Sequence, residues 1–258
     1  KSKAAQLGVK RLMEMGIQPH IIACRAAAPA TKKVRQKISV YTNVPLERVV
    51  SMHDCESIYM IPEQLRRAGT DRQVLELLAL TDRADEKADQ EHRREWEDFV
   101  RRITEASRKV TIGITGKYTA LRDSYASIIK ALEHAGTHLG TKVSIQWIDT
   151  TDLNGQNVPE LLKNVQGIIV PGGFGIRGTQ GKIACIEYAR THKLPFLGIC
   201  LGFQMAVLEF ARNVCGLSEA NSTEIQPGCA LPVIDILPEQ KKIEGLGGNM
   251  RLGGQDID

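Results

Sequence analysis

Residues 194–208 constrain the fold of this chain more than any other stretch, because they predict a short apolar strand, a sharp turn and an amphipathic helix. Cys200 stands at the turn, between Gly198 and Gly202. This is the thiol version of the G-x-S-x-G elbow, in which small flanking residues let a strained backbone hold a nucleophile clear of its neighbours. The N–H groups that open the helix favour a thiolate. We expect Cys200 to be a nucleophile; the alternative is a small core cysteine.

A second glycine-rich turn follows another short strand. Residues 167–170 are apolar and too few for a buried helix, and Pro171-Gly172-Gly173 comes directly after them. Glycines allow backbone N–H groups to turn inward, and an anionic tetrahedral intermediate needs such donors. The alternative interpretation is an ordinary glycine-rich connection. Two such loops at strand ends predict an oxyanion site beside the cysteine, with the N–H groups of Gly173 and Leu201 as donors.

The order of elements after residue 108 predicts an α/β fold with a doubly wound parallel sheet of flavodoxin-like type. We expect strands at residues 110–114, 143–148, 167–170 and 194–198, with helices between them and Asp123 capping the first helix. Right-handed crossovers place the loops at Gly116, Asp149, Pro171 and Cys200 on one edge of the sheet. A further strand over residues 231–237 and a mobile surface loop over residues 239–248 are also expected.

The first part of the chain predicts a piece of another α/β domain, over residues 1–82. A helix over residues 4–15 and a strand over residues 17–24 lead to Arg25, which we expect just past the strand, where open sheets bind ligands. A basic helix follows over residues 31–40. Residues 83–108 predict a charged linker helix whose narrow apolar stripe, from Trp96 to Ile103, docks on one of the domains it joins. Residues 109–258 then form the second domain.

Composition excludes several function classes. A chain of 258 residues with 42% hydrophobic content can give two domains a core each. Lys and Arg outnumber Asp and Glu by only 34 to 30, so we expect no nucleic-acid partner. The 6 cysteines lack paired C-x-x-C spacing and a histidine cluster, which predicts reduced thiols, no metal site and a cytoplasmic protein. No apolar run reaches the length of a membrane span.

Several motifs resemble the class I glutamine amidotransferase domain of the CTP synthase family. They are residues 171–175, 198–204, 220–224 and 247–253. Residues 1–6, 16–25 and 57–62 resemble the end of the synthetase domain of the same family, so the resemblance covers nearly the whole chain. It implies a ligase that uses ATP and Mg²⁺ to aminate UTP to CTP with ammonia from glutamine, with GTP as activator. It also implies feedback inhibition by CTP and a homotetramer.

The resemblance also implies roles for particular residues. Glutamine would be bound by Gly173, Leu201, Gly202, Phe203, Gln204 and Glu224, with Cys200 as the nucleophile. UTP, and CTP in competition with it, would be bound by Lys1, Ser2, Lys3, Ala4, Ala5, Gln6 and Lys37, although Ala4 and Ala5 replace the usual Pro-Thr pair. ATP would contact Arg25, Asp54 and Cys55, and Arg177 is a candidate for the GTP contact or an ordinary surface arginine.

A catalytic cysteine also needs a base. Of the 6 histidines, His192 precedes the strand that Cys200 ends, which separates them by roughly 20 Å or more. His134 and His138 are expected after a helix, on the opposite edge of the sheet. The family takes its base from a His-Pro-Glu segment and binds ATP and Mg²⁺ with a phosphate loop, and neither motif occurs in this sequence. The chain therefore resembles a truncated enzyme, and we expect little turnover from it alone.

Two alternatives from other classes remain open. One is a different hydrolase with a cysteine elbow on the same sheet, which would need its own histidine at the upper edge. The other is a non-catalytic assembly module, because the family forms tetramers through its synthetase domains.

Overall fold

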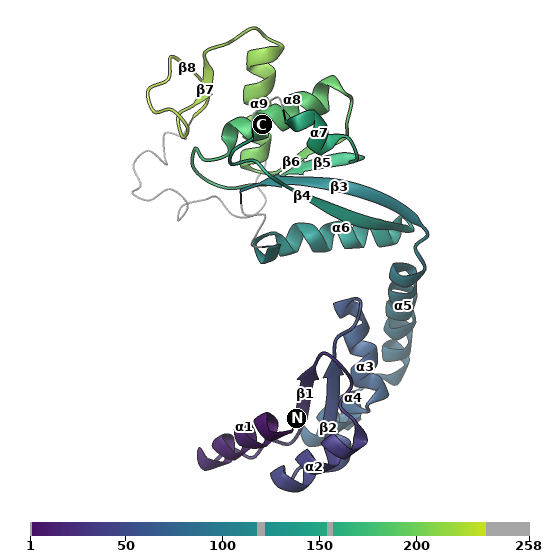
Figure 1. Ribbon diagram of the computed structural model, residues 1–258. Coiled ribbons are helices and arrows are strands. Elements are labelled where there is room, and N and C mark those ends of the chain that lie inside the picture. The colour runs from purple at the N-terminus through teal and green to yellow at the C-terminus, as the bar shows by residue number, and fades with distance from the viewer. Residues whose placement is uncertain (1, 118–121, 154–156, 236–258) are drawn as a thin grey trace. The chain divides into compact units, whose positions relative to one another are not determined.

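The computed structural model describes residues 2–117, 122–153 and 157–235 (Figure 1). The chain divides into two compact units, residues 1–105 and residues 106–258, and each unit is described by itself. None of the helices within the described ranges is both long enough and apolar enough to cross a membrane.

The first unit is built on a parallel pair of strands, β1 (Ile22–Ala26) and β2 (Val49–His53), in register from Ile22 opposite Val49. Helices α1 (Lys3–Glu14) and α2 (Lys32–Thr42) pack with them, and η1 (Leu46–Arg48) leads into β2. The apolar faces of these elements form a small core of Val9, Ile22, Ile38, Val44 and Val49. The β1 strand begins and ends later than predicted, and because it extends to Ala26, Arg25 lies within it and not beyond it.

The rest of the first unit is helical. After β2 come η2 (Ile58–Met60), α3 (Ile61–Arg67), α4 (Thr70–Leu77), η3 (Thr81–Arg83) and α5 (Glu86–Glu105). The apolar stripe of α5 packs on the segment before α3: Trp96 Nε1 donates to the carbonyl of Tyr59 at 2.8 Å, and the Tyr59 and Phe99 ring centroids are 5.3 Å apart. The charged helix therefore has an apolar contact inside the first unit.

The second unit is the predicted doubly wound sheet. Its strands are β3 (Arg108–Gly116), β4 (Thr141–Asp149), β5 (Gly167–Val170) and β6 (Phe196–Gly198), all parallel and in the order β4-β3-β5-β6. This is the flavodoxin-like order, which confirms the predicted fold class. Helix α6 (Ala126–His138) covers one face, and α7 (Val158–Leu162), α8 (Thr179–Thr191) and α9 (Leu201–Asn213) cover the other (Figure 1).

The core of the second unit lies between the sheet and the face that carries α7, α8 and α9. It contains Ile148, Ile168 and Val170 from the strands and Met205 and Leu208 from α9, all of them at most 2% exposed. A separate parallel pair, β7 (Ala220–Ser222) and β8 (Leu231–Ile234), packs against α9. Strand β7 is only three residues long, too short for an alternating pattern to reveal it.

Some local predictions for the second unit were wrong. Asp123 does not cap α6: it lies in η4 (Arg122–Tyr125), and Tyr125 occupies the N-cap position. His134 and His138 lie within the last turns of α6 and not after it. The strand predicted to run to residue 237 ends at Ile234 as β8, while residues 239–248 lie outside the described residues.

Candidate active site

Cys200 stands on a strained turn between β6 and α9. Its backbone has φ 53° and ψ −114°, a positive-φ conformation outside the left-handed helical region that non-glycine residues rarely adopt, and it occupies the N-cap position of α9. Such a conformation costs about 1–3 kcal/mol and persists only where neighbouring structure enforces it. The thiol is exposed. These are the properties of a nucleophile elbow, and they do not fit a core cysteine.

The glycines beside Cys200 are required by steric contact. A Cβ atom added to Gly202 would lie 1.9 Å from the carbonyl oxygen of Val170, and one added to Gly198 would lie 2.7 Å from the amide nitrogen of Phe203. Both neighbours are backbone atoms, which cannot rotate out of the way. Gly202 is therefore required where α9 meets the end of β5, and Gly198 is required where β6 meets the first turn of α9.

The Pro171-Gly172-Gly173 turn lies next to the cysteine. The N–H of Ile199 donates to the carbonyl of Val170 at 3.0 Å and joins the ends of β5 and β6. A Cβ on Gly172 would lie 3.3 Å from Cys200 Cβ and 3.8 Å from its Sγ. The loops that follow β5 and β6 thus meet at the carboxyl edge of the sheet, as the order of elements predicts.

Two lysines that the sequence analysis missed hold this turn. Lys182 on α8 is 2% exposed, and its Nζ donates to the carbonyl of Pro171 at 3.0 Å. Lys117, just after β3, donates its Nζ to the carbonyl of Phe174. Burial and the charge of Lys117 lower the pKa of Lys182 to about 8, and Cys200 acts in the opposite direction. The available signal was a lysine between Gly181 and Ile183, two positions that face inward on α8.

Glu224 reaches the same loop from the segment after β7. Its Oε1 accepts from the N–H of Gly175 at 3.0 Å, although the two residues are 49 positions apart. Among the other predicted glutamine contacts, Leu201 and Gly202 are buried in the first turn of α9, Phe203 is 60% exposed, and Gln204 donates its backbone N–H to the carbonyl of Cys200 at 3.1 Å. Arg177 is exposed before α8.

The other thiols and the histidines of this unit differ from Cys200 in place or environment. Cys185 is fully buried, and burial raises its pKa to about 12, so it is a packing residue. Cys215 is exposed, but it lies beyond the far end of α9. His192, after the end of α8, stacks on Tyr188 with 3.9 Å between the ring centroids. Because α6 and α8 return from the carboxyl edge, their histidines lie at the opposite edge from Cys200.

The predicted ATP contacts come together in the first unit. Arg25 on β1 forms an ion pair with Asp54, which follows β2, and the N–H of Asp54 donates to the carbonyl of Ala26 at 3.2 Å. Cys55 donates its Sγ–H to the carbonyl of Ser57 at 3.1 Å. These three residues therefore sit at the carboxyl end of a parallel strand pair, the edge at which α/β sheets bind ligands.

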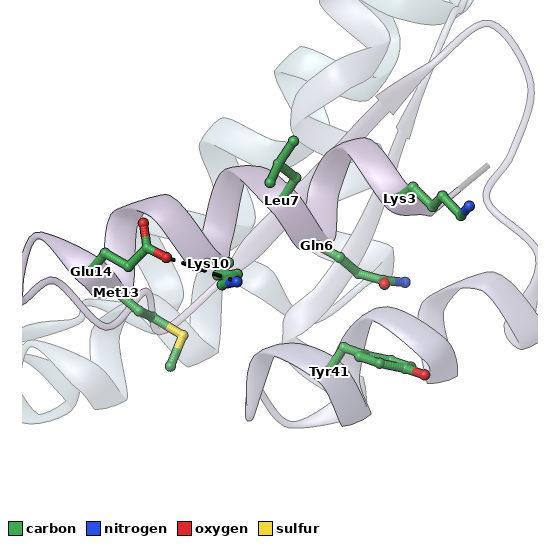
Figure 2. Close-up of a pocket in the computed structure, with 7 residues that line it drawn as sticks. All are labelled: Lys3, Gln6, Leu7, Lys10, Met13, Glu14 and Tyr41. Carbon is green, nitrogen blue, oxygen red and sulfur yellow. Dashed lines mark ion pairs between the residues drawn. The ribbon is translucent and has the colours of Figure 1, made fainter.

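The predicted UTP contacts gather at the start of α1. Ser2 is buried, and its Oγ accepts from Gln6 Nε2 at 2.8 Å; Lys3, Ala4 and Ala5 lie in the turn between them. Lys1 lies outside the described residues. An open groove of about 670 Å³ lies between α1 and α2 (Figure 2), and it is lined by Lys3, Gln6, Leu7, Lys10, Met13, Glu14 and Tyr41. Lys37, on α2, places its Nζ 5.9 Å from the Tyr41 ring centroid.

The described residues hold no group of three His, Cys, Asp or Glu side chains that could bind a metal ion. The geometry supports the chemistry of an exposed thiol beside backbone N–H donors, with two lysines and one carboxylate that bind the adjoining loop from other elements.

The fold and the elbow define this site as that of a class I glutamine amidotransferase. The family model described as "Glutamine amidotransferase class-I" matches residues 120–257, and the one described as "CTP synthase N-terminus" matches residues 1–80. The chain belongs to the CTP synthase family of class I glutamine amidotransferases.

The most similar relatives include CTP synthases from bacteria and archaea. The chain is 46% identical to that of Caldanaerobacter subterraneus subsp. tengcongensis over 253 residues, which are 98% of this chain and 46% of the relative. It is 47% identical to that of Archaeoglobus fulgidus over 260 residues, 100% of this chain and 47% of the relative. The chain therefore spans about half the length of the curated relatives it matches.

One solved structure is also similar. It is described as "Trypanosoma brucei CTPS - glutaminase domain with bound acivicin", and it is 38% identical, covers 51% of each chain and has a TM-score of 0.47.

Proposed function

We propose that the second unit hydrolyses the side-chain amide of glutamine. The Cys200 thiolate attacks the amide carbon, the C–N bond breaks as the leaving nitrogen takes a proton from solvent and departs as ammonia, and a thioester to Cys200 remains. Water then attacks the thioester and releases glutamate and the thiol. The oxyanion of each tetrahedral intermediate accepts hydrogen bonds from the N–H groups of Gly173 and Leu201.

Other residues of this edge would hold the substrate. Gly202, Phe203 and Gln204 open the helix beside the thiol, and Glu224 supplies a carboxylate for the ammonium group of glutamine. That carboxylate is occupied by the N–H of Gly175 in this structure, so the ammonium group would share or replace this donor. Arg177, exposed at the start of α8, is the proposed contact for the activator GTP.

The observation that carries this proposal is the conformation of Cys200. It is an exposed cysteine at φ 53°, at the start of a helix, with its Sγ 3.8 Å from the Cβ position of Gly172. Strain of this kind is retained where the surrounding structure enforces a functional geometry. A packing role would require neither the strain nor the exposure.

For the whole protein, we propose an ATP-dependent, cytoplasmic CTP synthase that uses this ammonia to aminate UTP. UTP and the inhibitor CTP would bind at Lys1–Gln6 and Lys37, and the adenine nucleotide at Arg25, Asp54 and Cys55. The synthetase part would cover residues 1–82, the linker helix residues 83–108 and the amidotransferase part residues 109–258. A homotetramer is proposed from the family, as are Mg²⁺ and GTP.

The residues of this chain suit the nucleotide but offer no binding site for Mg²⁺ among those that the structure describes. The Arg25–Asp54 pair at the carboxyl end of β1 and β2 suits a ribose or base. The described residues offer no cluster of metal ligands, and the sequence has no phosphate-loop motif. We therefore assign no Mg²⁺ ligand to this chain and derive no step through the metal.

The test is covalent labelling with a diazo-ketone analogue of glutamine, followed by peptide mass spectrometry. We expect the adduct on Cys200, and we expect Cys200→Ser to abolish it. Cys215 is the matched control, because it is also exposed but lies at the other end of α9. Labelling of Cys185 or Cys215 in place of Cys200 would contradict the proposed function.

A further inference from the structure

A buried lysine contacts the loop that carries one of the proposed oxyanion donors, Gly173. Lys182 is 2% exposed, whereas lysine side chains normally keep their ammonium group in water. Its Nζ donates to the carbonyl of Pro171 at 3.0 Å. A neutral carbonyl satisfies one donor of an ammonium group that has three, and it leaves the charge uncompensated. A buried charge of this kind needs a negative partner nearby.

The charged groups around Lys182 identify that partner. Lys117 repels it, and burial disfavours its charged form; these two effects lower the pKa of Lys182 to about 8. Among the described residues, Cys200 is the group that acts in the opposite direction. Coulomb attraction is mutual, so the Lys182 ammonium also acts on the Cys200 sulfur. Glu224, the carboxylate that contacts this loop from the segment after β7, accepts from the N–H of Gly175.

The backbone geometry places both groups at the same turn. A Cβ on Gly173 would lie 3.9 Å from Lys182 Nζ, while a Cβ on the preceding Gly172 would lie 3.8 Å from Cys200 Sγ. The ammonium and the sulfur therefore each approach one of two successive glycines. The Cβ position of Gly173 also lies 3.9 Å from Leu201 Cδ2 and 3.9 Å from Lys117 Cε.

We propose that Lys182 is a positioning residue that acts through Cys200: its buried ammonium, fixed on the Pro171 carbonyl, stabilises the thiolate needed for attack on glutamine. The proposal rests on the function proposed above. The proton that leaves Sγ passes to solvent, and Lys182 keeps its own proton. The attack of Cys200 on glutamine therefore requires the positive charge of Lys182 in addition to its hydrogen bond to Pro171.

The test measures the alkylation rate of each cysteine by iodoacetamide between pH 6 and pH 10, because the thiolate is the reactive form. Lys182→Gln removes the charge but keeps a donor, and Lys182→Met removes both. At pH 7 we expect both variants to slow Cys200 by roughly five- to tenfold and to move its rate profile to higher pH. Lys182→Arg, which keeps the charge, should restore most of the rate.

Cys215 in the same samples provides the control, because its rate should stay unchanged in every variant. Alkylation of Cys200 in Lys182→Gln and Lys182→Met at the wild-type rate would overturn the proposal. This reagent needs no glutamine site. Failure here, together with diazo-ketone labelling of Cys200, would therefore reject the role of Lys182 and leave the proposed function intact.

The pH dependence of the free energy of unfolding distinguishes this role of Lys182 from a packing role. The pKa of Lys182 is lowered from 10.5 to about 8 in the folded chain, so the buried charge destabilises the fold below pH 8, and this cost fades as pH rises from 8 to 10.5. Lys182→Met should therefore be at least as stable as the wild type at pH 7 and lose that advantage above pH 8. A Met variant that is less stable, with Cys200 reacting as in the wild type, would assign Lys182 a packing role.

Discussion

At the residue scale, the elbow depends on the absence of side chains at two glycines. Without a Cβ atom, Gly202 lets α9 begin against the end of β5, and Gly198 lets β6 end against the first turn of α9. Cys200 bears the strain that results, with a positive φ that glycine would adopt at lower cost. The sequence predicts this arrangement because the requirement is local: the spacing of two glycines around one cysteine.

Gly202→Ala tests the close approach. The added Cβ would lie 1.9 Å from the carbonyl oxygen of Val170, so β5 and α9 must move apart. We expect a loss of about 2–3 kcal/mol in the free energy of unfolding, measured by urea denaturation, together with slower alkylation of Cys200. Gly8→Ala is the control, because a Cβ there meets nothing within 4 Å and the residue lies in α1. It should gain about 0.5–1 kcal/mol. Equal effects would refute the steric argument.

At the scale of elements, sequence periodicity predicts the order of strands and helices in the second unit, but it does not predict the long-range contacts between them. Residues 167–170 form β5 as predicted, because a short apolar run bounded by glycine and proline is a local signal. The contact of Glu224 with Gly175 joins segments 49 positions apart, and the burial of Lys182 depends on how α8 meets the turn after β5. No local pattern contains either fact.

Helices α8 and α9 are joined by an ion pair in which only the carboxylate is buried. Glu209 is 1% exposed and accepts from Arg190 Nη2 at 2.7 Å, from Arg190 Nε at 3.0 Å and from Asn213 Nδ2 at 3.1 Å. Because removing one partner leaves an unpaired buried charge, the pair should stabilise the contact between the helices only while both members are present.

Arg190→Leu should therefore reduce the free energy of unfolding, because it leaves the buried Glu209 carboxylate with Asn213 as its remaining side-chain donor. The double variant Arg190→Leu/Glu209→Met should lose clearly less than the single one, since it removes the stranded carboxylate as well. Arg102→Leu breaks an exposed pair with Asp98 on α5 and should cost less than about 1 kcal/mol. A double variant as unstable as Arg190→Leu would contradict the assignment of a buried unpaired charge.

At the scale of the whole molecule, the proposed nucleophile and the proposed donors lie in one unit, and no histidine lies at their edge of the sheet. All 6 histidines are among the described residues. His134 and His138 lie on α6, and His192 is stacked on Tyr188 after α8, at the edge where the strands begin. The other three, His20, His53 and His92, belong to the first unit.

A protein of residues 1–258 should therefore hydrolyse glutamine slowly. We expect a turnover below about 0.01 s⁻¹, against about 10 s⁻¹ for a typical enzyme, because the thiol has no histidine to transfer its proton. Glutamate release is the measurement, and Cys200→Ser sets the background. Iodoacetamide should still alkylate Cys200, which would show that the elbow is folded. Turnover at ordinary enzymatic rates would contradict this account of the missing base.

The three attachments of the Pro171–Gly175 loop limit how this chemistry could be moved to another protein. Its carbonyls are held from α8 and from the end of β3, and its Gly175 amide is held from the segment after β7. Transplanting only the glycine-cysteine-glycine elbow onto a foreign sheet would transfer the sulfur without the scaffold that orients its partner loop. A functional transfer would need four separate segments: the elbow, the loop with α8, the end of β3 and the segment after β7. In α8 and at the end of β3, the contact with the loop is made by a single lysine.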